Sequence, residues 1–169
     1  MFQIGDSVIY GSYGACRIID IAEKEFCGKS GLYYVLEPVF GDSCTFFVDV
    51  NNGTAVSRLR PLLPPDSVDR LISAMPQVEE QWDDNAKLRR ASYSRIISQG
   101  DRIELIGLIK ALHFHELRQR SLGRKLNYSD EQYLRAAEKM IHQEIALSLH
   151  LQPEQVVPYI AGRLDLQAD

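Results

Sequence analysis

The stretch at residues 5–21 constrains the fold of this chain more than any other part of the sequence. An alternating apolar run with Val8 and Tyr10 enters a Gly-Ser-Tyr-Gly turn, and a second run with alternating isoleucines leaves it. Glycine tolerates positive φ, so Gly11 and Gly14 allow the chain to reverse sharply. The pattern predicts the first two strands of a small, strongly bent antiparallel barrel.

Short β-rich runs, separated by turn-forming residues, continue to about residue 60. The candidate strands are Val8–Tyr10, Cys16–Ala22, Tyr33–Pro38, Thr45–Val50 and Ala55–Leu59. Five short strands are too few for a sandwich, so we predict a five-stranded antiparallel barrel of the SH3 or Tudor-like type.

From residue 63 onward the apolar spacing is helical. The first expected helix is capped by Asp66 or Ser67 and ended by Pro76, and the second runs from Val78 to Ser98. Two more begin at capping signals, Asp101 with Glu104 and Ser129 with Gln132. A short last helix runs from Pro153 to Gly162. The sequence therefore predicts an α+β chain of two domains, a barrel in residues 1–62 and an all-α bundle in residues 63–169.

The charge balance limits which partners are plausible. A net charge of −4 argues against a strong, dedicated nucleic-acid-binding protein. Lysines and arginines concentrate between Lys87 and Lys125, so we expect any DNA affinity to be weak and salt-sensitive. There is no long apolar run and no signal-peptide pattern, and Cys16, Cys27 and Cys44 form no close pair, which fits a reducing cytoplasm.

No motif predicts catalysis. His113 and His115 stand two apart on an expected helix and point to different faces, so they cannot share a metal ion. His142 and His150 lack neighbours at ligand spacing. Gly28-Lys29-Ser30 resembles part of a P-loop without the upstream glycine or the following helix, and we interpret it as a hairpin turn. We expect no enzyme, metal, cofactor or small-molecule substrate.

The segment from Lys87 to Arg95 gathers positive charge on one side of an expected helix. Lys87, Arg90, Ser94 and Arg95 share one face, and Leu88, Tyr93, Ile96 and Ile97 share the other. Arg89 falls nearer the apolar side, so its stem should pack while its head reaches water or a partner. The basic face could hold two or three phosphates, or it could be an ordinary solvated surface.

Trp82, the only tryptophan, lies beside Asp83 and Asp84. Two interpretations stay open: an exposed contact residue, or a packing anchor between helices. If a helix runs through this region, Trp82 and Ala86 are four residues apart and lie on the same side of it.

Several motifs together resemble the CarD family of bacterial transcription regulators. They are Gly5-Asp6-x-Val8-x-Tyr10, Gly14, Tyr33–Leu36, Gly41-Asp42 and Ser57–Pro61 in the first half, and Arg89-Arg90, Gly100-Asp101, Leu108–Leu112 and Leu126–Leu149 in the second. The resemblance implies a non-enzymatic regulator. Its N-terminal domain would bind the RNA polymerase β subunit, and its helices would contact promoter DNA, largely without reading base sequence, and stabilise the open complex.

The resemblance also suggests site residues. Phe47 stands where many family members carry an arginine that holds the polymerase, which leaves Lys24 as the closest basic match. Phe46 is a further candidate, because strand alternation makes one of the two phenylalanines exposed and the other buried. The DNA-side candidates are Trp82, Lys87, Arg89, Arg90 and Arg95.

In the family, a tryptophan that wedges into the minor groove lies immediately before the Arg-Arg run, so Trp82 would be displaced by about one helical turn. A protein–protein adaptor without DNA contact is the alternative, and the acidic net charge favours it.

Overall fold

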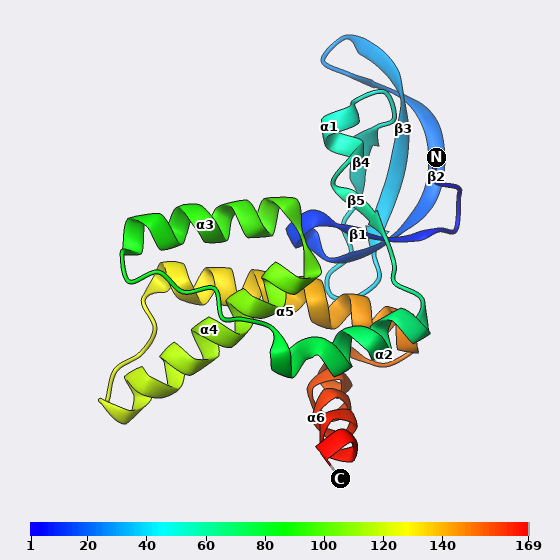
Figure 1. The fold of residues 1–169 in the computed structure, drawn as a ribbon. Coiled ribbons are helices and arrows are strands. Elements are labelled where there is room, and N and C mark those ends of the chain that lie inside the picture. Colours follow the sequence, from blue (N-terminus) through cyan, green and yellow to red (C-terminus); the bar gives the residue numbers. More distant parts are fainter. Residues whose placement is uncertain (169) are drawn as a thin grey trace. The chain divides into compact units, whose positions relative to one another are not determined.

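The computed structural model describes residues 1–168, and its backbone divides into two compact units, Met1–Leu62 and Leu63–Asp169 (Figure 1). Strands make up most of the first unit and helices the second, so the chain is α+β as predicted. Among the described helices, none has the length and apolar character needed to cross a membrane.

One antiparallel sheet forms the N-terminal unit. Its strands are β1 (Ser7–Tyr10), β2 (Ala15–Phe26), β3 (Lys29–Pro38), β4 (Phe46–Asp49) and β5 (Leu59–Pro61), in the order β4-β3-β2-β1-β5. A 3-10 turn, η1 (Gly11–Tyr13), joins β1 to β2. The β2–β3 hairpin turns at Cys27 and Gly28, whose φ angles of 51° and 75° suit a two-residue turn. The hairpin interpretation of Gly28 is therefore confirmed.

The inner face of this sheet carries the core of the unit. Its buried members are Val8, Cys16, Ile18, Tyr34, Leu36, Val48 and Leu59. A β-bulge between Ile18 and Asp20 interrupts the β2–β3 register, and bulges of this kind bend a strand. Among the described residues no ladder joins β4 to β5, so the pairings leave the sheet open instead of closing it as the predicted barrel.

The last predicted strand, Ala55–Leu59, was placed wrongly. Residues Gly53–Val56 form a single helical turn, α1, and β5 begins only at Leu59. The Asn52 side chain accepts a hydrogen bond from the Ala55 N–H, and asparagine at this position starts a helical turn.

Helices and 3-10 turns make up the C-terminal unit. They are α2 (Pro65–Ala74), η2 (Met75–Gln77), α3 (Ala86–Gln99), α4 (Arg102–Ser121), α5 (Tyr128–Leu149), η3 (Pro153–Gln155) and α6 (Val156–Ala168). Figure 1 shows α5 among the other helices, and it contacts α2, α3, α4 and α6. Apolar side chains such as Leu108, Met140 and Ile145 are fully buried in this unit.

The predicted helix over 78–98 is wrong in its first third, because α3 begins only at Ala86. The Asn85 side chain caps it and accepts hydrogen bonds from the N–H groups of Lys87 and Leu88. Residues 78–85 are not helical, and groups outside the segment form hydrogen bonds with part of its backbone. The Tyr93 hydroxyl donates to the Gln81 carbonyl, and the Gln81 N–H donates to the Gly107 carbonyl.

Other helix ends differ from the prediction by a few residues. Asp101 caps α4 as expected, but Asn127 and not Ser129 caps α5. The first helix starts at Pro65 without a side-chain cap from Asp66 or Ser67. The last helix continues through Gly162, since one helical glycine is unfavourable by only about 1 kcal/mol relative to alanine.

Candidate functional site

The outer face of the sheet carries an exposed aromatic cluster. Register places Phe47 opposite Val35, and Tyr33 opposite Ala22, on the face away from the core. The Phe26 ring centroid lies 5.2 Å from that of Phe47 and 5.0 Å from that of Tyr33. Phe26 is 42% exposed and Phe47 is 41% exposed. We call Phe26, Tyr33 and Phe47 the outer aromatic cluster.

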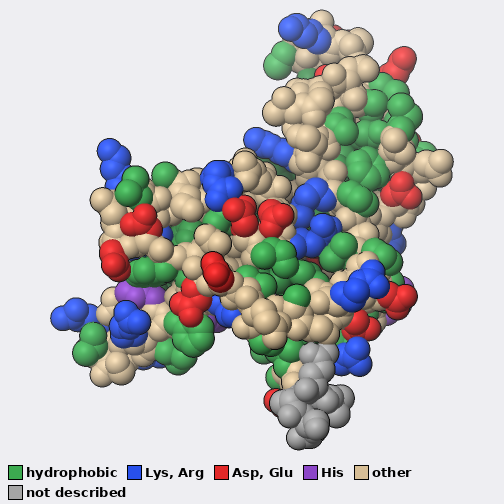
Figure 2. All heavy atoms as spheres, viewed as in Figure 1, with side chains coloured by type: hydrophobic (Ala, Val, Ile, Leu, Met, Phe, Trp, Pro, Cys, Tyr) green, Lys and Arg blue, Asp and Glu red, His purple; other side chains and the backbone are tan. Residues whose placement is uncertain are grey.

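Lys24 belongs to the same region, since it lies in β2 two residues before Phe26 and is exposed. Figure 2 shows hydrophobic side chains gathered on the surface of the strand-rich unit. Sequence reasoning missed Phe26, which stands in no family motif, and it did not single out Tyr33 within the Tyr33–Leu36 motif. Their positions on paired strands were the only signal that could have found them.

Phe46 points to the other side of β4. Its ring packs 4.6 Å from that of Tyr13 and 5.5 Å from that of Tyr10, next to the buried core. The prediction that one of the two phenylalanines is packed and the other exposed is confirmed. Strand β4 is also an edge of the sheet, with β3 as its partner.

In the helical unit, Arg89 is almost fully buried. Its guanidinium donates to both carboxylate oxygens of Asp130, at 3.0 and 3.3 Å, and to the Asp83 carbonyl at 2.9 Å. Asp130 lies at the start of α5 and also accepts a hydrogen bond from the Asn127 side chain. The expectation that the Arg89 head finds a partner is confirmed, and the pair links α3 to α5.

Trp82 lies in the non-helical segment before α3. Its ring is 4.4 Å from the Arg89 guanidinium and, by centroids, 4.4 Å from the His115 ring. Its indole N–H donates to the Asp84 carboxylate at 2.9 Å, and the residue is half-buried. The geometric argument that Trp82 and Ala86 share a helical face is therefore wrong, because no helix joins them.

The remaining basic candidates differ in whether they form ion pairs within the chain. Arg95 donates to both oxygens of Glu104, at 3.0 and 3.1 Å, and to Gln99. Lys87 and Arg90 are exposed, and no ion pair to either is found among the described residues. Leu88, expected on the packed face of the helix, is instead largely exposed. Two cations of the predicted face thus remain available to an external anion.

The histidines occupy different environments. His113 lies between Glu138 and Glu116, and the hydrogen bond to Glu138 raises its pKa. Burial lowers the pKa of His115 and of His142. In the part of the chain that the structure describes, no three His, Cys, Asp or Glu side chains are grouped to hold a metal ion.

An exposed aromatic cluster beside an open sheet edge, in a unit with its own core, is typical of a domain that binds another protein. Residues 2–60 match the family model of the CarD-like/TRCF RID domain. The N-terminal unit is therefore a CarD-like RNA polymerase-interacting domain, a non-catalytic interaction module, and the resemblance seen in the sequence is confirmed for residues 2–60. No curated protein matches the chain.

Proposed function

We propose that this protein regulates transcription by docking on the RNA polymerase β subunit through the outer face of β2–β4. The match of residues 2–60 to a polymerase-interacting domain carries the proposal. Phe47 and Lys24 supply the contact, and Phe26 and Tyr33 extend it, since exposed aromatic rings contribute strongly to protein interfaces. The edge of β4 offers unpaired backbone groups for strand addition. In this proposal the bulged sheet forms the polymerase-binding surface that was expected of a Tudor-like barrel.

The test is binding of purified β subunit to the full chain and to the variants Phe47→Ala and Phe26→Ala. We expect each to weaken binding about tenfold or more, because central aromatic contacts dominate interface energy. Phe114→Ala, which changes an exposed phenylalanine of the helical unit, is the matched control and should bind like the parent chain. Parent-like binding by both sheet variants would refute the assigned surface.

The DNA contact proposed for the helical unit rests on Lys87 and Arg90. Both lie on α3, are exposed and carry charge that phosphates attract. Two phosphate contacts give a log–log salt slope of about −2, so the contact is weak and largely independent of sequence. Once the protein is on the polymerase, even a weak contact with promoter DNA modulates open-complex stability, because docking raises the local concentration.

The second candidate is an adaptor on the polymerase that does not touch DNA. Three of the DNA-side candidates favour it, because they already contact groups of the chain itself. Arg89 forms an ion pair with Asp130, Arg95 forms one with Glu104, and the Trp82 ring packs against the His115 ring. The variant with Lys87→Glu and Arg90→Glu distinguishes the two functions. A regulator that contacts DNA loses open-complex stabilisation in this variant at unchanged affinity for the β subunit, whereas an adaptor keeps both.

Trp82→Ala adds a second distinction. As an anchor between Arg89 and His115, Trp82 contributes stability, and we expect its loss to lower the free energy of unfolding by about 2 kcal/mol. A DNA wedge would instead lose open-complex stabilisation with little change in the free energy of unfolding.

A further inference from the structure

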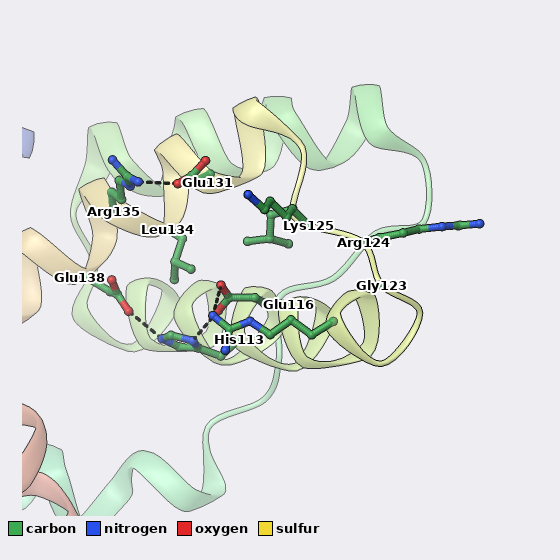
Figure 3. Close-up of a pocket in the computed structure, with 11 residues that line it drawn as sticks. His113, Glu116, Gly123, Arg124, Lys125, Glu131, Leu134, Arg135 and Glu138 are labelled. Atoms are coloured by element: carbon green, nitrogen blue, oxygen red, sulfur yellow. Dashed lines mark hydrogen bonds and ion pairs between the residues drawn. The ribbon is translucent and has the colours of Figure 1, made fainter.

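A cavity of about 540 Å³ opens between the second half of α4, the loop that follows it and the first half of α5 (Figure 3). It is lined by His113, Glu116 and Arg120 from α4, by Gly123, Arg124, Lys125 and Leu126 from the loop, and by Glu131, Leu134, Arg135 and Glu138 from α5. Small-molecule sites typically measure about 300–1,000 Å³. None of the polymerase or DNA candidates above lines this cavity.

Each carboxylate in the cavity already has a basic side chain as its partner. Glu138 contacts His113 at 2.6 Å, Glu116 contacts Arg120 at 3.2 Å, and Glu131 is paired with Arg135. The Glu138–His113 and Glu131–Arg135 pairs appear as dashed contacts in Figure 3. All three carboxylates of the lining are therefore engaged by groups of the lining itself.

In every one of these pairs the basic side chain is the more exposed member. The Arg120 side chain is 68% exposed and its partner Glu116 30%; Arg135 is 69% exposed and Glu131 42%. His113 is likewise more exposed than Glu138. Each guanidinium has five N–H donors and uses only part of them on its partner. The guanidinium groups of Arg120 and Arg135 therefore keep donors that their partner carboxylates do not use.

The lining also carries more positive than negative charge. It includes four lysines or arginines and three glutamates, an excess of one positive charge before His113 is counted. Lys125 is exposed and has no ion pair among the described residues, and Arg124 extends away from the cavity in Figure 3. The buried Leu134 and the half-buried Leu126 add an apolar wall.

We propose that this cavity binds a small organic phosphate monoester of about the size of a nucleoside monophosphate. Arg120, Lys125 and Arg135 hold the phosphate, and Leu126 and Leu134 pack against the organic part. A phosphate monoester carries about two negative charges near neutral pH and presents three strong acceptor oxygens, which guanidinium groups bind in a bidentate way. The proposal does not depend on the polymerase or on DNA.

The test is titration of the full chain with AMP, followed by calorimetry and by amide NMR shifts. We expect saturable binding with shifts confined to residues 113–138, and no binding of adenosine, which lacks the phosphate. Lys125→Gln should weaken AMP binding about tenfold, as expected for one lost charge-assisted hydrogen bond. Lys139→Gln is the control, because Lys139 is exposed on α5 but lies outside the lining.

A dinucleotide whose only phosphate is a phosphodiester tests whether the cavity binds phosphate monoesters or the phosphates of nucleic acids. It should bind far more weakly than AMP. The proposal fails if adenosine binds as well as AMP, if the dinucleotide displaces AMP at equal concentration, or if Lys139→Gln weakens binding as much as Lys125→Gln. Circular dichroism confirms that each variant is folded.

Discussion

Arg89 shows how burial changes the role of a charged side chain. In the sequence it is one of several neighbouring cations, but in the structure its guanidinium is enclosed between Asp130, the Asp83 carbonyl and the Trp82 ring. A buried ion is tolerated only while its partner remains, because taking a lone charge out of water is strongly unfavourable. We therefore assign Arg89 a structural role and not a phosphate contact.

Arg89→Ala should lower the free energy of unfolding by about 3–5 kcal/mol, since it leaves the fully buried Asp130 carboxylate without its charge partner. Urea denaturation followed by circular dichroism measures the change. Its neighbour Arg90 is exposed, so Arg90→Ala should stay within about 0.5 kcal/mol of the parent chain. Equal stability of the two variants would contradict a structural role for the Arg89–Asp130 pair.

Residues 78–85 cover α4 at a point of very close approach. The Gln81 N–H donates to the Gly107 carbonyl, and the Lys110 ammonium donates to the carbonyls of Met75, Pro76 and Val78. A Cβ on Gly107 would lie 2.5 Å from the Glu79 carbonyl oxygen, which is backbone and cannot simply rotate away. The absence of a side chain at Gly107 is what allows this segment to lie on the helix.

Gly107→Ala should therefore lower the free energy of unfolding by roughly 1–3 kcal/mol, the usual penalty for overpacking. Gly162→Ala is the matched control, because it changes another helical glycine whose Cβ would meet open space. That control should be neutral or more stable by up to about 1 kcal/mol. Thermal denaturation of both variants measures the difference, and a Gly107→Ala protein as stable as Gly162→Ala would rule out the close contact.

The α4–α5 pair is linked by a histidine, His113, whose pKa is raised by its partner. The hydrogen bond from His113 to the Glu138 carboxylate raises the His113 pKa, and burial opposes it in part. The other titratable groups nearby are Glu116 on α4 and His142 on α5. A raised folded-state pKa means that the folded chain binds the proton more tightly than the unfolded chain does.

The stabilisation from His113 should thus be complete below its unfolded pKa of about 6.5 and should disappear as pH rises through the higher folded value. An NMR titration of the imidazole measures that pKa directly. Glu138→Gln should lower it toward the ordinary value, whereas Glu131→Gln, which removes a carboxylate paired with Arg135, should leave it nearly unchanged. A His113 pKa that is the same in the Glu138→Gln variant as in the parent chain would contradict the effect assigned to Glu138.

The two units of the molecule each have their own buried side chains. The strand unit has a separate core, and the family match lies wholly within it, at residues 2–60. A domain of this size buries enough surface to fold alone, although with a modest margin. Partner binding should therefore be separable from the helical unit.

Residues 1–62, expressed alone, should bind the polymerase β subunit with an affinity close to that of the whole chain, while residues 63–169 should not bind it. Circular dichroism first establishes that each fragment is folded, and pull-down with calorimetry then measures binding. A folded sheet unit without affinity, together with a helical unit that binds the β subunit, would reverse the assignment of the docking surface.

Local sequence signals predicted much of this structure. Apolar alternation and glycine turns predicted the antiparallel strands β1 to β4, and helical spacing with Asp101 as a cap predicted α4. Alternation also separated the packed Phe46 from the exposed Phe47. These properties depend on residues close together in the chain, so periodicity and capping chemistry determine them.

Long-range contacts decided the rest. Segment 78–85 was predicted to be helical, but hydrogen bonds to Tyr93, Lys110 and Gly107 hold it on its neighbours in a non-helical conformation. No local pattern shows that Arg89 meets Asp130 forty-one positions later, or that Phe26 reaches Phe47 across β3. By itself the sequence determined the strand and helix character and the family, because these follow from local pattern and motif. Only the tertiary structure decided which charges are free and which are bound internally, because a partner distant in the chain becomes a neighbour only when the chain folds.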